Sequence, residues 1–301
     1  MNSFTIMIDT GADLPQDFID EHSIATIPIP FNLDGVQHSG GRWQEISDRE
    51  FYDALRDGSV AGTALINPDA FAQVFTDFAI RGEQLLVITL SSGLSGTYQN
   101  SAIALSDVKN EYPDCQIYSV DSTNAAGGAG LIAALAVRKR AEGLSIEETV
   151  KWLEEKKHSC LSLFTVNDLM YLHRGGRLSK VSAIAGSIIG IKPLLNVAPD
   201  GTLKLKDKAR GRGAALKTLF SQMKRSLPDT NNLDTVIISH SNCAEDAEVL
   251  AELIKSSLSV RDILIVMMGP VIGAHVGPGC VALFYESDMT RPEYEAKFYG
   301  K

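Results

Sequence analysis

Residues 86–102, LVITLSSGLSGTYQNSA, join an apolar run to a helix-like sequence through serines and glycines. We call residues 91–97 the serine loop. It contains four hydroxyl side chains and two glycines: Ser91, Ser92, Ser95, Thr97, Gly93 and Gly96. The first amides of a helix lack partners within the helix, and the helix dipole favours an anion in front of them. The glycines let a ligand approach the backbone, and the hydroxyl groups add donors. The stretch predicts a buried strand, a loop that can bind phosphate or carboxylate, and a helix.

Three other interpretations of the serine loop stay open. Ser95 can simply cap the following helix, with the glycines forming only the turn. A serine hydrolase or acyltransferase would take its nucleophile, base and orienting acid from Ser92 or Ser95, His275, and Asp121 or Asp9. The third is a binding protein for a phosphorylated metabolite. No GK[ST] follows the loop, and its order differs from the G-x-S-x-G elbow, so neither of those motifs is indicated.

The first half of the chain alternates between predicted strands and helices. Strands are expected at residues 4–9, 84–90 and 115–122, and helices at 14–24, 47–57, 67–81, 97–112, 125–141 and 145–158. This order predicts a mostly parallel sheet with helices on both faces, a three-layer α/β arrangement. Ligands bind such sheets at the carboxyl ends of the strands. Three loops are expected there: residues 9–13, the serine loop and residues 121–123.

The order of predicted strands and helices is different in the second half of the chain. Residues 191–209 predict a hairpin that turns at Pro199, Asp200 and Gly201, so at least one antiparallel pair is expected. Further strands are expected at 160–166, 234–241, 262–269 and 279–285, and helices at 211–227 and 244–258. We therefore expect two α/β domains, residues 1–159 with a parallel sheet and residues 160–301 with a mixed one. A cleft between domains is a favoured ligand site.

Composition places the chain among ordinary globular proteins. With 301 residues, of which 45% are hydrophobic, it can bury a full core. No apolar run of about 18 residues occurs, and the N-terminus does not resemble a signal peptide, so no membrane insertion and a cytoplasmic location are expected. The four cysteines, Cys115, Cys160, Cys243 and Cys280, are far apart, which predicts reduced thiols, no disulfide and no metal site. A monomer is expected.

Charge is unevenly distributed. The net charge of -9 disfavours nucleic acid and anionic membranes as general partners. Residues 174–217, which we call the basic segment, contain ten Lys and Arg against two Asp, a local charge of +8 that leaves -17 on the remainder. This predicts an acidic ligand or partner. The alternative is a half-exposed strand face, because LKLKDKA at residues 203–209 alternates in polarity.

Two further motifs can serve an anion. His275 lies in GPVIGAHVGPGC, residues 269–280, where it can sit at a strand end, face a cleft and titrate near neutral pH. Arg174 and Arg177 flank two glycines in HRGGR, which is typical of guanidinium groups displayed from a turn. The alternatives are a histidine hydrogen-bonded inside a turn and arginines that face solvent.

Several segments, taken in chain order, resemble those of the DegV family, a bacterial fatty-acid-binding family. They are MIDTGADLP (7–15), GTALINPDAF (62–71), TLSSGLSGTYQNSA (89–102), YSVDSTNAAGGAG (118–130), YLHRGGRLS (171–179), GIKPLLNV (190–197) and GPVIGAHVGPGCVALF (269–284). The resemblance covers essentially the whole chain. Its most specific part is the succession of SSGLSGTYQ, HRGGRLS and H-x-G-P-G.

The resemblance implies a carrier rather than an enzyme. A long-chain fatty acid would lie in a tunnel between the two domains, with no further cofactor. A separate fatty acid kinase would convert its carboxylate to an acyl phosphate for phospholipid synthesis. The head-group residues that the resemblance implies are Thr63, Ser92 or Ser95, His275, and Arg177 with Arg174 as the alternative. Arg210, inside the basic segment, would dock the kinase.

One segment departs from the family's usual T-S-Q-P-S pattern. This chain has Thr63-Ala64-Leu65-Ile66-Asn67, which keeps the threonine but replaces a serine and a proline. Carboxylate binding through Thr63 is compatible with the change, but the side chains beside it are more apolar. The resemblance therefore does not extend to head-group geometry and chain preference.

Overall fold

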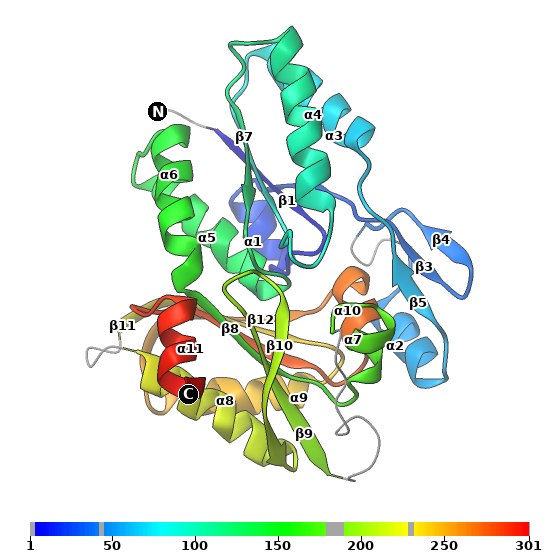
Figure 1. Ribbon diagram of the computed structural model, residues 1–301, viewed down its shortest axis with the longest axis vertical. Coiled ribbons are helices and arrows are strands. Elements are labelled where there is room, and N and C mark those ends of the chain that lie inside the picture. The colour runs from blue at the N-terminus through cyan, green and yellow to red at the C-terminus, as the bar shows by residue number, and fades with distance from the viewer. Residues whose placement is uncertain (1–3, 42–44, 179–189, 228–231, 301) are drawn as a thin grey trace.

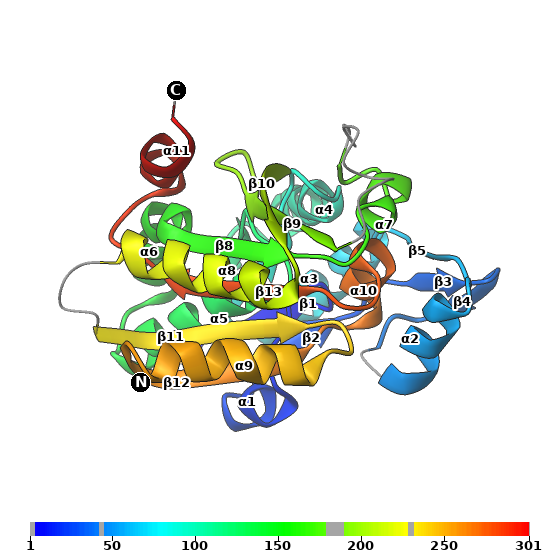
Figure 2. The same cartoon turned by 90° about the horizontal axis from the view of Figure 1, so that it is seen from below.

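The computed structural model describes residues 4–41, 45–178, 190–227 and 232–300. Figures 1 and 2 show two large sheets with helices packed on them and a small sheet at one side. The strands are β1 (Thr5–Asp9), β2 (Ala25–Ile27), β3 (Phe31–Leu33), β4 (Val36–His38), β5 (Ala61–Thr63), β6 (Leu85–Thr89), β7 (Ile117–Asp121), β8 (Cys160–Thr165), β9 (Ile191–Val197), β10 (Leu203–Arg210), β11 (Asn232–His240), β12 (Ser259–Met267) and β13 (Val281–Glu286). The helices are α1 (Gln16–Glu21), α2 (Asp48–Arg56), α3 (Pro68–Arg81), α4 (Thr97–Glu111), α5 (Gly127–Ala141), α6 (Ile146–Lys156), the 3-10 turn η1 (Lys157–Ser159), α7 (Met170–Arg174), α8 (Arg212–Ser226), α9 (Ala244–Lys255), α10 (Pro270–Val276) and α11 (Arg291–Tyr299).

The first sheet has four strands in the order β2-β1-β6-β7, and all its described pairs are parallel. Helices α3 and α4 pack on one face, and α5 and α6 on the other. The predicted parallel sheet with helices on both faces is confirmed. Strand β6 is buried at every position, as its unbroken apolar run predicts for a strand covered on both faces.

The second sheet is mixed, with six strands in the order β10-β9-β8-β13-β11-β12. The predicted antiparallel hairpin is confirmed by β9 and β10, whereas β11 and β12 run parallel. Helices α8 and α9 cover its outer face. Strand β10 lies at the edge of this sheet, so the alternation in LKLKDKA is that of an edge strand with one face towards solvent.

Helix α5 lies between the two large sheets and packs on β1 and β6 from one side and on β8, β11 and β13 from the other. Its glycines make this possible. A Cβ at Gly127 would stand 2.6 Å from the Ile237 side chain, and one at Gly130 would stand 2.3 Å from the Asp13 carbonyl oxygen. The apolar core is therefore continuous across both sheets. The expected boundary between residues 159 and 160 falls where the chain passes from one sheet to the other, and as a domain boundary it stays a prediction.

Side-chain caps mark the start of several helices. Ser47 and Ser145 each form a capping box with the Glu at the third helical position, and Asn67 accepts from the Ala70 amide at 2.7 Å. These starts follow the sequence signals.

Several short or terminal elements were not expected from the sequence: strand β2, the small antiparallel sheet β4-β3-β5, and the helices α7, α10 and α11. The expectation that His275 lies at a strand end is wrong. It lies in the last turn of α10, which begins with Pro270 and ends at Gly277 in a positive-φ conformation. Because prolines and glycines flank this helix of seven residues, its sequence is typical of a loop.

Candidate functional site

An apolar cavity lies between the two large sheets, with an empty volume of about 740 Å³ including its mouth. Apolar side chains from both halves of the chain form most of its wall, among them Leu90, Leu94, Phe164, Leu203, Met268 and Phe284. Four polar residues also line it: Thr63, Ser95, Arg177 and His275. The wall is suited to a ligand with a long apolar part and one polar end.

Two hydrogen bonds position three of the four polar residues, and the charge of Arg177 acts on His275. Thr63, the last residue of β5, places its Oγ1 2.9 Å from Nε2 of His275. Arg177 donates from Nε to the carbonyl oxygen of Leu94, the residue before Ser95, at 3.1 Å. Segments that are more than 200 residues apart in the sequence therefore meet at one end of the ligand space.

The electrostatics of this group favour an anion. Burial, together with the positive charge of Arg177, lowers the pKa of His275 to about 4, so its imidazole is neutral at pH 7. Arg177 is half-buried, and all its hydrogen bonds to described residues go to carbonyl oxygens, of Leu94 and Gly175. Within the described residues, Nδ1 of His275 has no hydrogen-bond partner. A guanidinium without a carboxylate beside a neutral histidine leaves a net positive field at the polar end of the cavity.

The serine loop uses its backbone amides within the protein. The amides from Ser91 to Ser95 all donate: Ser91 to Asn124 O (2.7 Å), Ser92 to Asp121 Oδ1 (3.1 Å), Gly93 to Ser91 Oγ (3.1 Å), and Leu94 and Ser95 to Ser91 O (3.0 Å each). These five amides are therefore not available to an anion. The prediction concerned the first amides of α4, of which that of Thr97 donates to Ser95 Oγ at 3.3 Å, and it stays a prediction.

The serine loop still contributes side chains to the site. Ser95 lines the cavity, and its hydroxyl lies 2.9 Å from the hydroxyl of Thr97. Ser92, Gly93 and Gly96 do not belong to the described wall of the cavity. Gly93 instead packs so closely on the turn between β9 and β10 that a Cβ there would stand 2.6 Å from the Asp200 carbonyl oxygen. Of the two serines that the family resemblance left open, Ser95 is thus the one in the cavity.

The carboxylates proposed for a hydrolase have other partners. Asp9 accepts from the amides of Gly11 (2.8 Å) and Leu90 (2.7 Å), and burial raises its pKa to about 7. Asp121 accepts from the amides of Ser92 and Thr123. The hydrogen bonds of the described residues join His275 to Thr63 and not to a serine or a carboxylate, so they do not form a Ser-His-acid triad.

A second hollow lies on the outer side of the same polar group. Thr63, Arg177 and His275 line both spaces, and the outer hollow adds residues 59–62, Tyr171, Arg174 and Ala274. Val60 and Arg174 are exposed, so this hollow lies at the surface. Arg174 stacks on the ring of Tyr171 at 4.7 Å and lines only the outer hollow, whereas Arg177 lines both.

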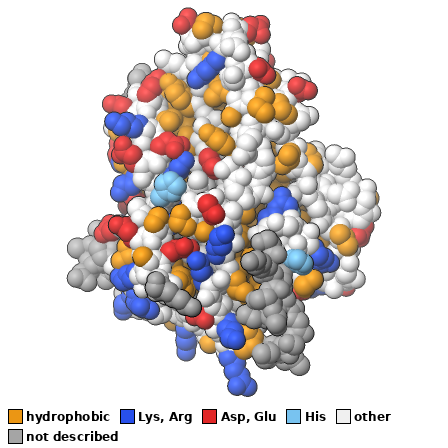
Figure 3. Space-filling model, in the orientation of Figure 1, with side chains coloured by type: hydrophobic (Ala, Val, Ile, Leu, Met, Phe, Trp, Pro, Cys, Tyr) orange, Lys and Arg blue, Asp and Glu red, His pale blue; other side chains and the backbone are white. Residues whose placement is uncertain are grey.

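The basic segment lies mainly on the hairpin of β9 and β10. Figure 3 shows Lys and Arg side chains over the lower part of this face and acidic side chains mostly over its upper part and left margin. Lys204, Lys208 and Arg210 on β10 are exposed, while Lys206 pairs with Glu295 at 2.7 Å. Lys180, also counted in the basic segment, lies outside the described residues.

Two residues that bear on the site, Ala64 and Arg291, were not predicted as site residues. Ala64, where the family usually has serine, lines the cavity beside Thr63. Arg291, discussed below, begins α11, and the pattern Thr290-Arg291-Pro292-Glu293 is a capping-box signal that predicts that helix start. Among the described residues, no group of His, Cys, Asp or Glu side chains could hold a metal ion. None of the described helices is long and apolar enough to cross a membrane.

Comparison with known proteins agrees with this geometry. A DegV domain-containing protein of Clostridium perfringens is 38% identical over 292 residues, which are 97% of this chain and 100% of that protein. A structure described as a DegV lipid-binding protein from Thermotoga maritima has a TM-score of 0.84 and 29% identity, covering 96% of this chain and 99% of that one. A second protein from the same organism, described as revealing a fatty acid binding function, has a TM-score of 0.83 and 30% identity, covering 95% and 100%. The family model described as "Uncharacterised protein, DegV family" matches residues 3–288, and the chain belongs to the DegV family.

Proposed function

We propose that this protein binds one long-chain fatty acid in the cavity between the two sheets. The carboxylate lies among Thr63, Ser95, Arg177 and His275, and the hydrocarbon chain lies along the apolar wall. The protein acts as a non-catalytic carrier, as a monomer, and presents the carboxylate to a separate fatty acid kinase.

The observation that carries this proposal is the single polar group in an otherwise apolar cavity. A buried carboxylate without partners would cost several kcal/mol, and this group offers hydroxyl and guanidinium donors in one place. Each buried methylene of the chain adds about 0.8 kcal/mol to the affinity. Chain burial therefore supplies most of the binding free energy, and the polar group fixes the orientation.

Presentation to a kinase is supported by the outer hollow. Because Thr63, Arg177 and His275 also line this hollow, a carboxylate held by them can be reached from the surface. In the proposed reaction, a carboxylate oxygen attacks the terminal phosphorus of a kinase-bound ATP, and ADP leaves. The exposed basic residues of β10, including Arg210, form a surface for an acidic partner.

The binding proposal is tested by titrating delipidated protein with oleate and with oleyl alcohol. Thr63→Val is expected to weaken oleate binding about tenfold, because a buried partner of the head group is lost, and to leave the alcohol nearly unaffected. Thr218→Val, at a half-buried position on α8 outside the cavity wall, is the matched control. Equal affinity of the unmodified protein for acid and alcohol would refute the assigned polar end.

The kinase proposal has its own pair of variants. Arg210→Glu is expected to abolish kinase-dependent acyl phosphate formation while leaving oleate affinity unchanged. Arg49→Glu, at an 87% exposed position on α2 outside the basic segment, is the charge-matched control. If both variants support acyl phosphate formation equally, Arg210 does not belong to the docking surface.

A further inference from the structure

Arg291, the first residue of α11, is a charged side chain with an exposed fraction of only 1%. Its guanidinium donates five hydrogen bonds: Nε to Cys160 O (3.2 Å), Nη1 to Thr123 O (2.8 Å), Thr123 Oγ1 (3.1 Å) and Ala198 O (3.4 Å), and Nη2 to Lys157 O (3.3 Å). All these acceptors, within the described chain, are neutral oxygen atoms. Burial lowers its pKa to about 10, so the group remains charged at neutral pH.

The first set of acceptors belongs to residues 121–124, which hold the serine loop. Thr123 donates its amide to Asp121 Oδ1 at 2.8 Å, and the same oxygen accepts from the amide of Ser92 at 3.1 Å. The carbonyl oxygen of Asn124 accepts from the amide of Ser91 at 2.7 Å. Arg291 thus fixes the segment whose oxygen atoms accept from the amides of Ser91 and Ser92.

The second set belongs to the turn between β9 and β10. Ala198 accepts from Arg291 and also from the amide of Gly201. The carbonyl oxygen of Gly201 in turn accepts from the hydroxyl of Ser91 at 2.8 Å. Ser91 then binds the amides of Leu94 and Ser95 through its own carbonyl oxygen, both at 3.0 Å. A chain of hydrogen bonds therefore runs from Arg291 to the serine that lines the cavity.

Backbone strain marks the same place. Thr123 has φ of 50°, a conformation that a β-branched residue rarely adopts. Such a conformation persists only where the surroundings hold it, and it concentrates at functional sites. At Thr123 the surroundings are Arg291, which binds both its carbonyl and its hydroxyl oxygen, and Asp121, which binds its amide.

We propose that Arg291 is a positioning residue that holds residues 121–124 and 198–202 against the serine loop and thereby places the Ser95 hydroxyl for the carboxylate. The inference rests on the proposed function for the identity of that head group. Its structural part, the ordering of the serine loop by Arg291, is independent of any ligand. Val197 and Leu203, which flank the turn, line the cavity, so the same contacts also define its wall.

The test compares Arg291→Gln with Arg140→Gln. Arg140 is a matched control because it is also partly buried, has a pKa lowered by burial, and donates to backbone oxygens, of Phe4 (3.0 Å) and His22 (2.7 Å), outside the cavity. The first measurement is hydrogen exchange of the amides of residues 91–95 in delipidated protein. The second is the ratio of oleate to oleyl alcohol affinity. Ser91→Ala, which removes the hydrogen bonds of the Ser91 hydroxyl to Gly201 O and from the Gly93 amide but keeps Arg291, serves if Arg291→Gln fails to fold, with exchange then read at the amides of Leu94 and Ser95.

In Arg291→Gln, or in Ser91→Ala, exchange of the serine-loop amides is expected to rise, and the acid-to-alcohol ratio to fall about tenfold, as for one lost head-group hydrogen bond. In Arg140→Gln both should match the unmodified protein. Unchanged exchange and an unchanged ratio in the first two variants would overturn the proposal. If serine-loop exchange rises while the unmodified protein itself shows no preference for the acid, Arg291 orders the loop and the proposed function fails instead.

Discussion

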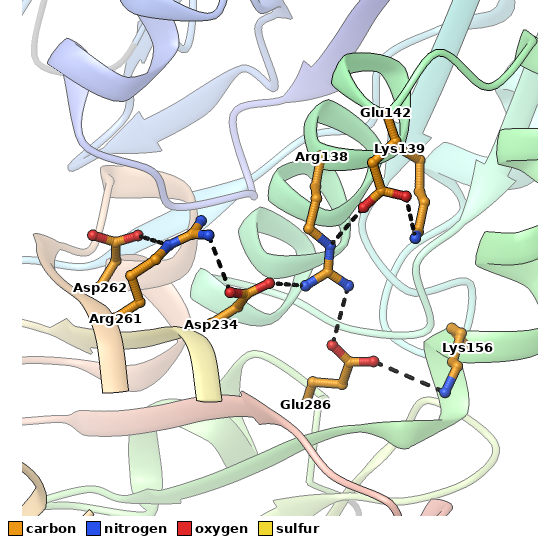
Figure 4. Close-up of polar contacts among 8 residues, drawn as sticks. All are labelled: Arg138, Lys139, Glu142, Lys156, Asp234, Arg261, Asp262 and Glu286. Carbon is orange, nitrogen blue, oxygen red and sulfur yellow. Dashed lines mark hydrogen bonds and ion pairs between the residues drawn. The ribbon is translucent and has the colours of Figure 1, made fainter. Parts of the chain in front are cut away.

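Two arginines connect the first half of the chain to the six-stranded sheet in contrasting ways. Arg291 is almost fully buried, and its described acceptors are all neutral oxygens. Arg138 on α5 is 26% exposed and lies among carboxylates. As Figure 4 shows, it contacts Asp234 of β11 and Glu286 of β13, and Arg261, Lys156, Lys139, Glu142 and Asp262 extend the network.

The contrast indicates that an arginine can contribute strongly to stability without forming an ion pair. The Arg138 ion pairs are partly hydrated, so their attraction is screened and each contributes little. The described hydrogen bonds of Arg291 go to no carboxylate, but removing it would leave several buried carbonyl oxygens without donors. Mutation of the buried Arg291 should therefore cost much stability at any salt concentration, whereas mutation of the half-buried Arg138 should cost little, and only at low salt.

The largest effect is expected for Arg291→Met. Loss of the guanidinium leaves buried acceptors unsatisfied, so the free energy of unfolding should fall by about 3 kcal/mol or more. Urea denaturation at low salt and at about 1 M NaCl should give the same loss, because the interaction is buried. A loss of unfolding free energy that disappears at high salt would mean that Arg291, like Arg138, acts through screened charge interactions.

An intermediate effect is expected from pH at the cavity. The pKa of His275 in the folded protein, about 4, lies below its ordinary value of 6.5, so the unfolded chain binds the proton more readily. The contribution of neutral His275 is fully present above about pH 6.5 and is lost as the pH falls to about 4, amounting to about 3 kcal/mol.

Urea denaturation across this pH range, in the unmodified protein and in His275→Gln, isolates that contribution. The difference in free energy of unfolding between the two proteins should change by about 3 kcal/mol between pH 6.5 and pH 4, since the variant lacks the titrating imidazole. A difference that stays constant with pH would mean that folding does not lower the pKa of His275.

The smallest effect is expected for Arg138→Gln. At low salt the free energy of unfolding should fall by about 0.5–1 kcal/mol, and at about 1 M NaCl the loss should vanish. A double-mutant cycle with Asp234→Asn separates the pair from the rest of the network. A coupling energy that persists at high salt would mean that the contacts of Arg138, like those of Arg291, are not screened by salt.

Much of the fold could be predicted from local signals. The serine loop between β6 and α4, the capping boxes at Ser47 and Ser145, and the turn at residues 199–201 all correspond to observed elements. Parallel strands also bring the ends of β1, β6 and β7 together, as expected. These features depend on neighbours in the sequence, which is why the sequence carries them.

The site could be predicted only in part. Thr63, Arg177 and His275 meet at the cavity, yet no pattern in their own segments reports the contact between Thr63 and His275, which are 212 residues apart. The hydrogen bonds from the amides of residues 91–95 to Asn124, Asp121 and Ser91 itself also had no signal in the sequence. A residue that lines a cavity also has the same apolar character as one that fills a core, so the sequence does not distinguish them.

The central claim is that the cavity holds one long-chain fatty acid. Native mass spectrometry of the full chain purified from a bacterial host, followed by extraction and identification of the released ligand, tests it most directly. We predict a mass increment equal to one fatty acid per chain, which is lost on delipidation and restored by added oleate. A protein that carries a phosphorylated metabolite, or one that stays empty when oleate is added, would contradict the claim.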